Sequence, residues 1–243
     1  MPLAKSKMTD SLKKNVFITA GNRGIGYALV EAYLKKGYCV YTTFRSVQKS
    51  SLLLQNNHPH LYKIQLDIKN SDSLRDIKSF LSDSPIDIMI HNACSFGYQA
   101  NELNTLQSEE WQDSFYVNTI FPIQLSVMLK ENIKGSQDKK VVFISSRRGS
   151  NTVNITDAYK GRYAYRSSKA ALNSAALALS QDFSDDEISV LILHPGRVAT
   201  EVTNYDSISP FKSARHIVKL VEKLTVEGTG QFLSADSGKK IAW

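Results

Sequence analysis

A tyrosine and a lysine stand four positions apart in the segment 165–169, which reads Tyr-Arg-Ser-Ser-Lys. If this segment is helical, the phenol of Tyr165 and the ammonium of Lys169 share one face. A free phenol has a pKa of about 10, and a neighbouring cation lowers that pKa because it stabilises the phenolate. The pair therefore predicts a proton donor for an oxygen that gains negative charge, as when a hydride is transferred to a carbonyl.

Two further features can serve the same chemistry. Ser145 and Ser146 end an apolar run at 141–144, and a hydroxyl there can donate a hydrogen bond to a substrate oxygen. The segment 19–26, Thr-Ala-Gly-Asn-Arg-Gly-Ile-Gly, lies between an apolar run at 16–18 and a segment with helical spacing. Glycines allow a sharp turn close to a phosphate, and a helix N-terminus offers free N–H groups. We expect a phosphate-binding turn, with a plain glycine turn as the alternative.

The end of the second apolar run bears on the choice of nucleotide. No Asp or Glu occurs between Glu31 and Asp67, whereas Arg45 follows directly after the strand predicted at 38–43. An acidic side chain at this place binds the ribose hydroxyls of NAD, and an arginine pairs with a 2′-phosphate. Arg45, with Arg23 as a second candidate, therefore favours NADP(H), unless Arg45 is simply a solvated loop residue.

The period of the apolar residues defines the elements that must position these groups. Strands are expected at 16–18, 38–43, 61–66, 86–90, 141–144, 188–193 and 231–233. Helices are expected at 25–36, 71–81 with Ser71 as N-cap, about 108–133, 163–183 and 211–224. This alternation predicts the α/β class, as a single Rossmann-type doubly wound parallel sheet of about seven strands with helices on both faces. Irregular segments at 94–107, 147–162 and 196–210 would follow strands, at the carboxyl ends where such sheets bind ligands.

In this order, over about residues 15 to 205, the motifs resemble those of the short-chain dehydrogenases/reductases. The turn is similar to the family signature Thr-Gly-x-x-x-Gly-x-Gly, with Ala20 in place of the first glycine. The segment 92–94, Asn-Ala-Cys, resembles the family's Asn-Ala-Gly, with Cys94 in place of glycine. Within the family, the sequences of the segments 145–150 and 163–173 look most like those of the branch of Sniffer-type and C-factor-type carbonyl reductases.

The resemblance implies an NADP(H)-dependent oxidoreductase that reduces an aldehyde, ketone or quinone, with Tyr165 as proton donor. The catalytic residues it implies are Asn118, Ser146, Tyr165 and Lys169. Asn118 would hold a water and support the lysine, and Ser146 would be the catalytic member of the serine pair. The cofactor-binding residues that it implies, together with the turn and the arginines above, are Thr19, Gly21, Asn22, Arg23, Gly24, Ile25, Gly26, Arg45, Asp67, Ile68, Asn92, Ala93, Tyr165, Lys169, Pro195, Gly196, Val198 and Thr200.

Some alternatives remain open at this stage. The C-factor relatives suggest an NADPH-binding signalling or sensor protein with little turnover, and a pathway enzyme that reduces a pteridine or a ketoacyl group is a third possibility. Phe96, Tyr98 and Tyr205 lie in the loops expected at the site, and they favour an apolar or aromatic substrate. Ser146 and Tyr165 lie 19 positions apart where many family members have about 13, so 147–162 carries an insertion, which a loop tolerates cheaply.

Composition and charge limit the domain organisation and the kinds of partner to be expected. The 243 residues are 42% hydrophobic and 22% charged, which suits one domain at 15–243 after a frayed basic tail at 1–14. The net charge of +7 forms no dense basic run, so nucleic acid is not expected as a partner. Cys39 and Cys94 are too isolated for a disulfide framework, and the pair His58 and His60 lacks further ligands for a metal.

Location and assembly follow from the same reading. No apolar stretch reaches the roughly 18 residues of a membrane span, and the start lacks a secretory apolar region, so we expect a cytoplasmic protein with no membrane partner. The segment 170–179 is rich in Ala and Leu on nearly every face, which predicts burial in the core or against a second subunit. Because the matching helix often forms an interface in the family, the resemblance implies a homo-oligomer, a dimer or tetramer.

Overall fold

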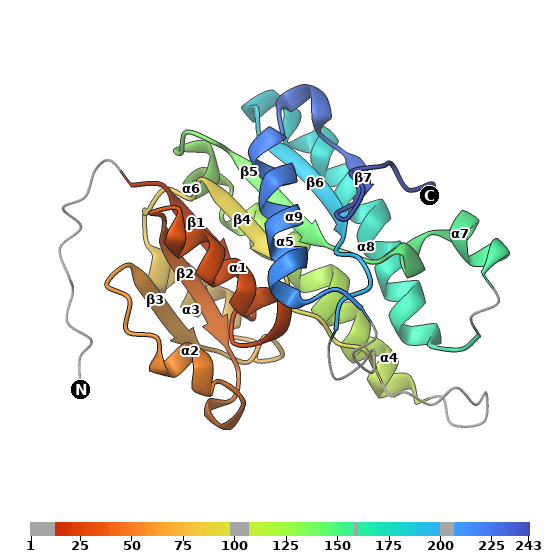
Figure 1. Ribbon diagram of the computed structural model, residues 1–243, viewed down its shortest axis with the longest axis horizontal. Helices are drawn as coiled ribbons and strands as arrows, with labels where there is room; N and C mark the ends of the chain where they lie inside the picture. Colours follow the sequence, from red (N-terminus) through yellow and green to blue (C-terminus); the bar gives the residue numbers. More distant parts are fainter. Residues whose placement is uncertain (1–12, 98–106, 158–159, 200–206) are drawn as a thin grey trace.

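Short apolar runs form the strands of one parallel sheet. The computed structural model describes residues 13–97, 107–157, 160–199 and 207–243 (Figure 1). Within them the sheet consists of β1 (Asn15–Ile18), β2 (Cys39–Phe44), β3 (Leu61–Gln65), β4 (Ile88–His91), β5 (Lys140–Ile144), β6 (Ser189–His194) and β7 (Gln231–Ser234). Their order is β3-β2-β1-β4-β5-β6-β7, and every neighbouring pair is parallel. The direction of winding reverses between β1 and β4, which confirms the predicted doubly wound fold.

Helices cover both faces of this sheet. They are α1 (Gly24–Lys35), α2 (Ser51–Gln55), α3 (Ser73–Leu81), α4 (Ser108–Phe115), α5 (Phe121–Met128), α6 (Lys130–Lys134), α7 (Asn151–Thr156), α8 (Tyr163–Asp182) and α9 (Pro210–Lys223). Single turns of other helix types lie at η1 (Val47–Lys49), η3 (Tyr116–Ile120), η4 (Arg147–Gly149), η5 (Ser184–Asp186) and η6 (Val226–Gly228), of which η3 is a π-helix.

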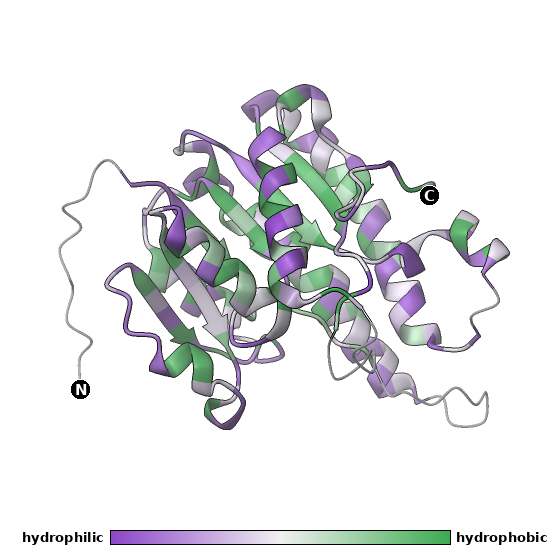
Figure 2. Cartoon of the chain, in the orientation of Figure 1, coloured by the Kyte–Doolittle hydropathy of each residue, from purple (hydrophilic) through white to green (hydrophobic). Residues whose placement is uncertain are grey.

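Alternation along each strand divides the core into two layers. Val16 and Ile18 of β1 pack with α1 and α9, whereas Phe17 between them packs with α3, α5 and α8. Apolar colour accordingly dominates β4 and β6 in Figure 2, whereas β2, which contains a tyrosine and two threonines, is paler, and the outer surface of α9 is hydrophilic. Because successive side chains of a strand point to opposite faces, a fully apolar strand serves both layers at once.

Several predicted elements differ in detail from the structure. The helix expected at 108–133 is divided by the π-turn η3 and again at Leu129. Ser71 is not an N-cap, because α3 begins at Ser73 with Asp72 at that position. The segment 147–162, expected to be irregular, contains η4 and α7, and α2 was not predicted. Short helices of five or six residues carry too little periodicity to stand out in a sequence.

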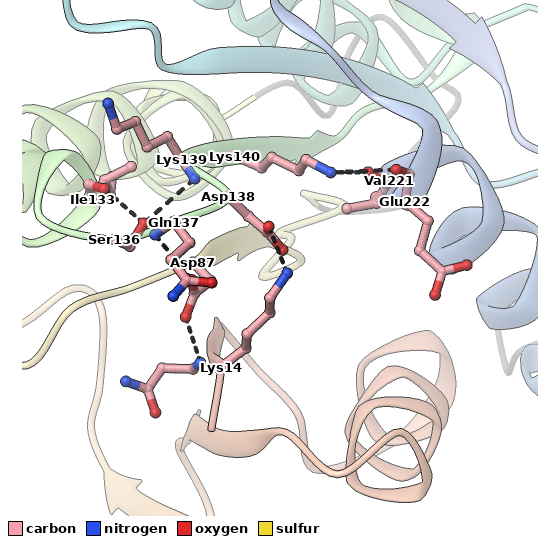
Figure 3. Close-up of polar contacts among 11 residues, drawn as sticks. Lys14, Asp87, Ile133, Ser136, Gln137, Asp138, Lys139, Lys140, Val221 and Glu222 are labelled. Atoms are coloured by element: carbon pink, nitrogen blue, oxygen red, sulfur yellow. Dashed lines mark hydrogen bonds and ion pairs between the residues drawn. The ribbon is translucent and has the colours of Figure 1, made fainter. Parts of the chain in front are cut away.

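A polar network closes the end of the sheet where the strands begin, which we call the amino edge (Figure 3). Buried Asp87 accepts hydrogen bonds from the backbone N–H groups of Asn15 (2.7 Å) and Gln137 (3.2 Å). Lys14 pairs with Asp138 at 2.7 Å. Lys140 Nζ donates to the carbonyl of Val221 at 2.9 Å, in the last turn of α9 where carbonyls lack helical partners.

The cysteines, the helices and the N-terminal segment can be compared with their predictions. Cys39 and Cys94 are free, as expected. Among the described residues, no helix is long and apolar enough to cross a membrane. Of the tail predicted at 1–14, residues 1–12 lie outside the described residues, and Lys14 belongs to the amino edge. The tail and its boundary therefore remain a prediction.

Candidate active site

A pocket of about 510 Å³ lies along the opposite end of the sheet, which we call the carboxyl edge. It brings together many of the predicted cofactor residues, namely Asn22, Arg23, Gly24, Ile25, Gly26, Arg45, Asp67, Ile68, Asn92, Ala93, Tyr165, Lys169 and Pro195. It is also lined by Ser145 of the serine pair and by residues outside the predicted set, including Thr43, Ser46, Lys49, Lys69, Cys94, Val117 and Ala199. Of the predicted set, Thr200 lies outside the described residues.

The glycine turn between β1 and α1 is tightly packed. A Cβ on Gly26 would lie 2.2 Å from the carbonyl oxygen of Ala20, and one on Gly21 would lie 2.1 Å from Thr42 Oγ1. Ala20 itself has φ 56°, in the left-handed region where the family signature has glycine. Gly21 therefore does not replace the missing glycine of the turn: it is required because β2 approaches closely.

Thr19 and Asn92 fasten this turn to the end of β4. Thr19 Oγ1 accepts hydrogen bonds from the N–H groups of Asn92 (2.9 Å) and Ala93 (3.0 Å). Asn92 Nδ2 donates to the carbonyl oxygens of Thr19 (3.2 Å) and Ala20 (3.1 Å). Because Thr19 is buried and does not line the pocket, its place in the structure is to hold the two loops in register.

One end of the pocket carries positive charge. Arg23, Arg45 and Lys49 all line it, and Asn22 Nδ2 donates to the carbonyl of Lys49 at 2.9 Å. Asp67, after β3, accepts from the N–H of Lys69 and is the one carboxylate among the described lining residues. Lys69 also lines the pocket and pairs with Asp113, which is not a lining residue. Four cations against one lining carboxylate suit a phosphate-bearing ligand.

Tyr165 and Lys169 line the other end, on one face of α8 as their spacing predicts. Lys169 is 2% exposed, and its Nζ donates to the carbonyl of Ile144 at 2.9 Å. The ring of Tyr165 stacks on Phe96, with centroids 5.1 Å apart and planes inclined by 25°. Burial raises the pKa of the nearby Cys94 thiol, and the ammonium of Lys169 opposes that shift.

Asn118 lies within the π-turn η3 and connects two parts of the site. Its Nδ2 donates to the carbonyl of Ser95 (2.7 Å) and to Ser168 Oγ (2.9 Å), and its Oδ1 accepts from the N–H of Ser95 (2.8 Å). The side chain is 1% exposed and does not line the pocket. A π-turn frees backbone groups from the regular ladder and occurs often at functional sites, which the apolar period alone cannot reveal.

The two serines after β5 point to different partners. Ser145 lines the pocket, and its hydroxyl donates to Asn173 Oδ1 of α8 at 2.5 Å. Ser146 is 6% exposed, and its Oγ accepts from the N–H of Arg148 at 3.1 Å as the N-cap of η4. The Ser146 proton is not used in that bond, so the hydroxyl keeps its capacity to donate.

Two predicted residues after β6 also stand back from the pocket. Gly196 has φ +90°, a conformation that favours glycine, and it turns the chain so that Pro195 and Ala199 line the pocket. Val198 is 4% exposed and forms a β-bridge with Ile208. These two residues therefore shape the loop without lining the pocket.

The insertion at 147–162 is anchored on both sides. Arg148 Nη1 pairs with Asp157 at 2.8 Å, and Ser150 Oγ caps α7 by accepting from the N–H of Val153. Thr152 donates from its N–H (3.0 Å) and its hydroxyl (2.6 Å) to the carbonyl of Trp243. The additional residues thus form an ordered helix beside Ser146.

Comparison with known proteins identifies the class. Residues 14–208 match the family model of the short chain dehydrogenases. Sniffer, a carbonyl reductase of D. melanogaster, superposes with a TM-score of 0.84 at 28% identity, over 95% of this chain and 100% of that chain. The NADPH-bound carbonyl reductase from chicken fatty liver gives 0.85 at 26% identity, over 95% and 99%. C-signal of Myxococcus xanthus is 29% identical over 171 residues, which is 70% of this chain and 100% of that protein.

Together with the doubly wound fold, these matches make the protein an oxidoreductase. Because the family model spans most of its length, the chain belongs to the short chain dehydrogenase family.

Proposed function

We propose that this protein is an NADP(H)-dependent reductase that converts a carbonyl group into an alcohol, with Tyr165 as the proton donor. The observation that carries the proposal is that one pocket joins Tyr165 and Lys169 to the glycine turn and to Arg45. Carbonyl reductases with 28% and 26% identity to this chain, the second bound to NADPH, support the same assignment.

The residues of the pocket suit a nicotinamide dinucleotide. Gly26 leaves room at the start of α1, where free N–H groups and the helix dipole favour a pyrophosphate. Arg45, Arg23 and Lys49 supply the charge that a 2′-phosphate requires, and Asp67 with Ile68 flanks the place expected for the adenine. Pro195 and Ala199 border the end that holds Tyr165, which would take the nicotinamide.

The protein's own residues manage the proton. When bound, the reduced nicotinamide would supply the hydride to the carbonyl carbon. Tyr165 then donates its proton to the carbonyl oxygen as negative charge develops there, and Lys169 favours the resulting phenolate. Lys169 would also hold the nucleotide's ribose, after exchanging its present bond to the carbonyl of Ile144.

Two further residues would assist. Ser146 would donate a hydrogen bond to the substrate oxygen by rotation of its hydroxyl proton, while its Oγ continues to accept from the N–H of Arg148. Asn118 would act through its backbone, because its side chain is fully engaged by Ser95 and Ser168. In the proposed relay, its carbonyl would hold the water that returns a proton to Tyr165 by way of Lys169.

Replacement of one hydroxyl tests the proposal. We expect Tyr165→Phe to lower kcat by about 100-fold to 10,000-fold, because general-acid catalysis is lost, while the Kd for NADPH changes little. Tyr163→Phe is the matched control, since Tyr163 lies on the same helix but does not line the pocket. The measurement is NADPH oxidation with a panel of aldehydes, ketones and quinones. Unchanged turnover by Tyr165→Phe would refute the role of Tyr165.

The similarity to C-signal favours a second candidate, an NADPH-binding signalling protein with little turnover. That candidate predicts tight binding of NADPH but no oxidation of it by any carbonyl in the panel.

We also propose a homo-oligomer that uses the faces of η3, α5 and α8, where Ile120 (43% exposed) and Val127 (55% exposed) leave apolar surface open. Sedimentation of the wild type and of Val127→Glu tests this assembly.

A further inference from the structure

An aromatic residue covers the ring of the proposed proton donor. Phe96 stacks on Tyr165 with a centroid separation of 5.1 Å, and it lines the pocket. It is nevertheless 37% exposed, so one part of its surface contacts Tyr165 while another part stays open. A side chain in this position contacts whatever group is attached to the carbonyl that Tyr165 protonates.

The backbone on both sides of Phe96 is firmly held. Ser95 exchanges two hydrogen bonds with the side-chain amide of Asn118, at 2.8 and 2.7 Å. Gly97 has φ +64°, and a Cβ there would lie 3.1 Å from Ser114 Oγ and 3.4 Å from Ala164 Cβ. Because Asn118 also bonds Ser168 of α8, the segment that carries Phe96 is tied to the helix that carries Tyr165. The stack is thus a built feature of the site.

Apolar residues contribute to the pocket that holds the stack. Val117, Ile144 and Ala199 line the same pocket, and Lys169 is the charged side chain that the described residues contribute beside Tyr165. A substrate oxygen bonded to Tyr165 Oη brings the carbonyl substituent next to the open surface of Phe96. A flat π-system there would extend the stack of two rings, whereas a saturated ring of equal size would gain only apolar contact.

We infer that Phe96 is a specificity-determining residue that selects carbonyl compounds with an aryl or otherwise conjugated flat substituent. This inference rests on the proposed function, because it takes Tyr165 as the group that binds the substrate oxygen. Phe96 acts on the substrate itself, so its contribution depends on the shape of the substituent. Loss of the flat ring should therefore change the ratio of kcat/KM between an aryl substrate and its saturated counterpart more than it changes the rate with the saturated substrate.

The test compares benzaldehyde with cyclohexanecarbaldehyde, with NADPH as the reductant. We expect the wild type to prefer benzaldehyde in kcat/KM, and Phe96→Leu to lower that preference by about 3-fold to 10-fold, mainly through KM. Phe96→Tyr keeps the ring and should keep the preference. Tyr62→Leu is the control, because it removes one ring of a stacked pair with Tyr41 (4.7 Å), which does not line the pocket.

The outcomes separate this inference from the proposed function. Equal losses with both aldehydes in Phe96→Leu would overturn the inference, because Phe96 would then act only by holding Tyr165. Turnover by the wild type without an aryl preference would overturn it as well, and would leave the reductase proposal standing. No turnover of either aldehyde, nor of the wider carbonyl panel, would overturn both.

Discussion

The two edges of the sheet are built from different kinds of interaction. At the amino edge, buried Asp87 and the cations Lys14 and Lys140 are satisfied by side chains or by backbone groups of the chain itself (Figure 3). At the carboxyl edge, Arg45 and Lys49 line a pocket of about 510 Å³. The polar groups of the amino edge thus stabilise the fold, whereas those of the carboxyl edge line a space that can hold a ligand. The difference predicts that substitutions at the two edges separate stability from binding.

Asp87→Ala should produce the largest effect of the predictions that follow. It would leave the N–H groups of Asn15 and Gln137 buried without their acceptor. We expect a loss of about 2–4 kcal/mol in the free energy of unfolding, measured by urea denaturation. The affinity for NADPH of the folded protein should not change. Asp138→Ala removes the partner of partly exposed Lys14 and should cost less than about 1 kcal/mol. An equal loss of stability in both variants would show that the buried hydrogen bonds of Asp87 contribute no more than the ion pair between Asp138 and Lys14.

Gly26→Ala should act at the other edge. The new Cβ would lie 2.2 Å from the carbonyl of Ala20 and 2.6 Å from Asn92 Nδ2, so the turn must move. Overpacking of about 1–3 kcal/mol corresponds to a loss of roughly 5-fold to 150-fold in NADPH affinity, measured by fluorescence titration. Gly228→Ala is the matched control: its Cβ would meet Leu224 at an ordinary 3.5 Å, away from the pocket. If Gly26→Ala binds NADPH as tightly as the wild type, the glycine turn is not part of the cofactor-binding site.

Acid should weaken the carboxyl edge first. Burial lowers the pKa of His91 to about 3 and, with a smaller contribution from Arg147, that of His194 to about 4. The unfolded chain then binds more protons than the folded protein from about pH 6.5 down to these values, so stability falls as the pH is lowered. The slope is at most about 1.4 kcal/mol per pH unit for each histidine.

The carboxylate of Asp186 does not contribute to this early loss. Lys130 and Lys134 lower the pKa of Asp186 to about 2, so the stability that this group contributes is lost only as the pH falls below about 4. Urea denaturation at pH 6.5, 5.5 and 4.5 measures the effect, and His194→Asn should reduce the slope. A free energy of unfolding that stays constant over this range would show that the buried histidines do not titrate as expected.

The contrast between the edges also explains what the sequence can predict. Tyr165, Lys169, the glycine turn and Arg45 are recognisable because each pairs a residue type with a spacing that its chemistry requires. All of them line the pocket except Thr19 and Gly21 of the turn. The seven strands are equally evident, since buried parallel strands are short apolar runs. Local spacing was sufficient in both cases.

Features that depend on contacts across the fold were not predictable in this way. The role of Thr19 and Asn118 as fasteners depends on partners many positions away, and a polar residue that holds two loops looks the same in sequence as one that lines a pocket. Lys49 reaches the pocket only because η1 bends the chain after β2. The hydroxyl directions of Ser145 and Ser146 are set by Asn173 and by η4, neither of which the serine pair itself encodes.

Ala20→Gly should have the smallest effect and should test the comparison of edges most finely. A left-handed alanine costs roughly 1–2 kcal/mol and a glycine about 0.5–1 kcal/mol through its greater freedom when unfolded. We therefore expect a net gain of about 0.5–1 kcal/mol in the free energy of unfolding. Glu187 is the matched position near the amino edge, because it too is non-glycine at φ 58° and its side chain is 74% exposed.

Glu187→Gly should give a similar or slightly smaller gain in stability, because the two residues share one backbone conformation but Glu187 also pairs with Lys139 at 3.2 Å in an exposed ion pair. The variants should differ in binding, because Ala20 borders the pocket and Glu187 does not. If the strain at Ala20 is relieved when the turn closes on a pyrophosphate, Ala20→Gly will weaken NADPH binding slightly as it stabilises the free protein. If the turn is already set for the ligand, affinity will rise or stay constant. A change in affinity of the same size in Glu187→Gly would mean that the two edges are coupled, and that the division of labour between them is wrong.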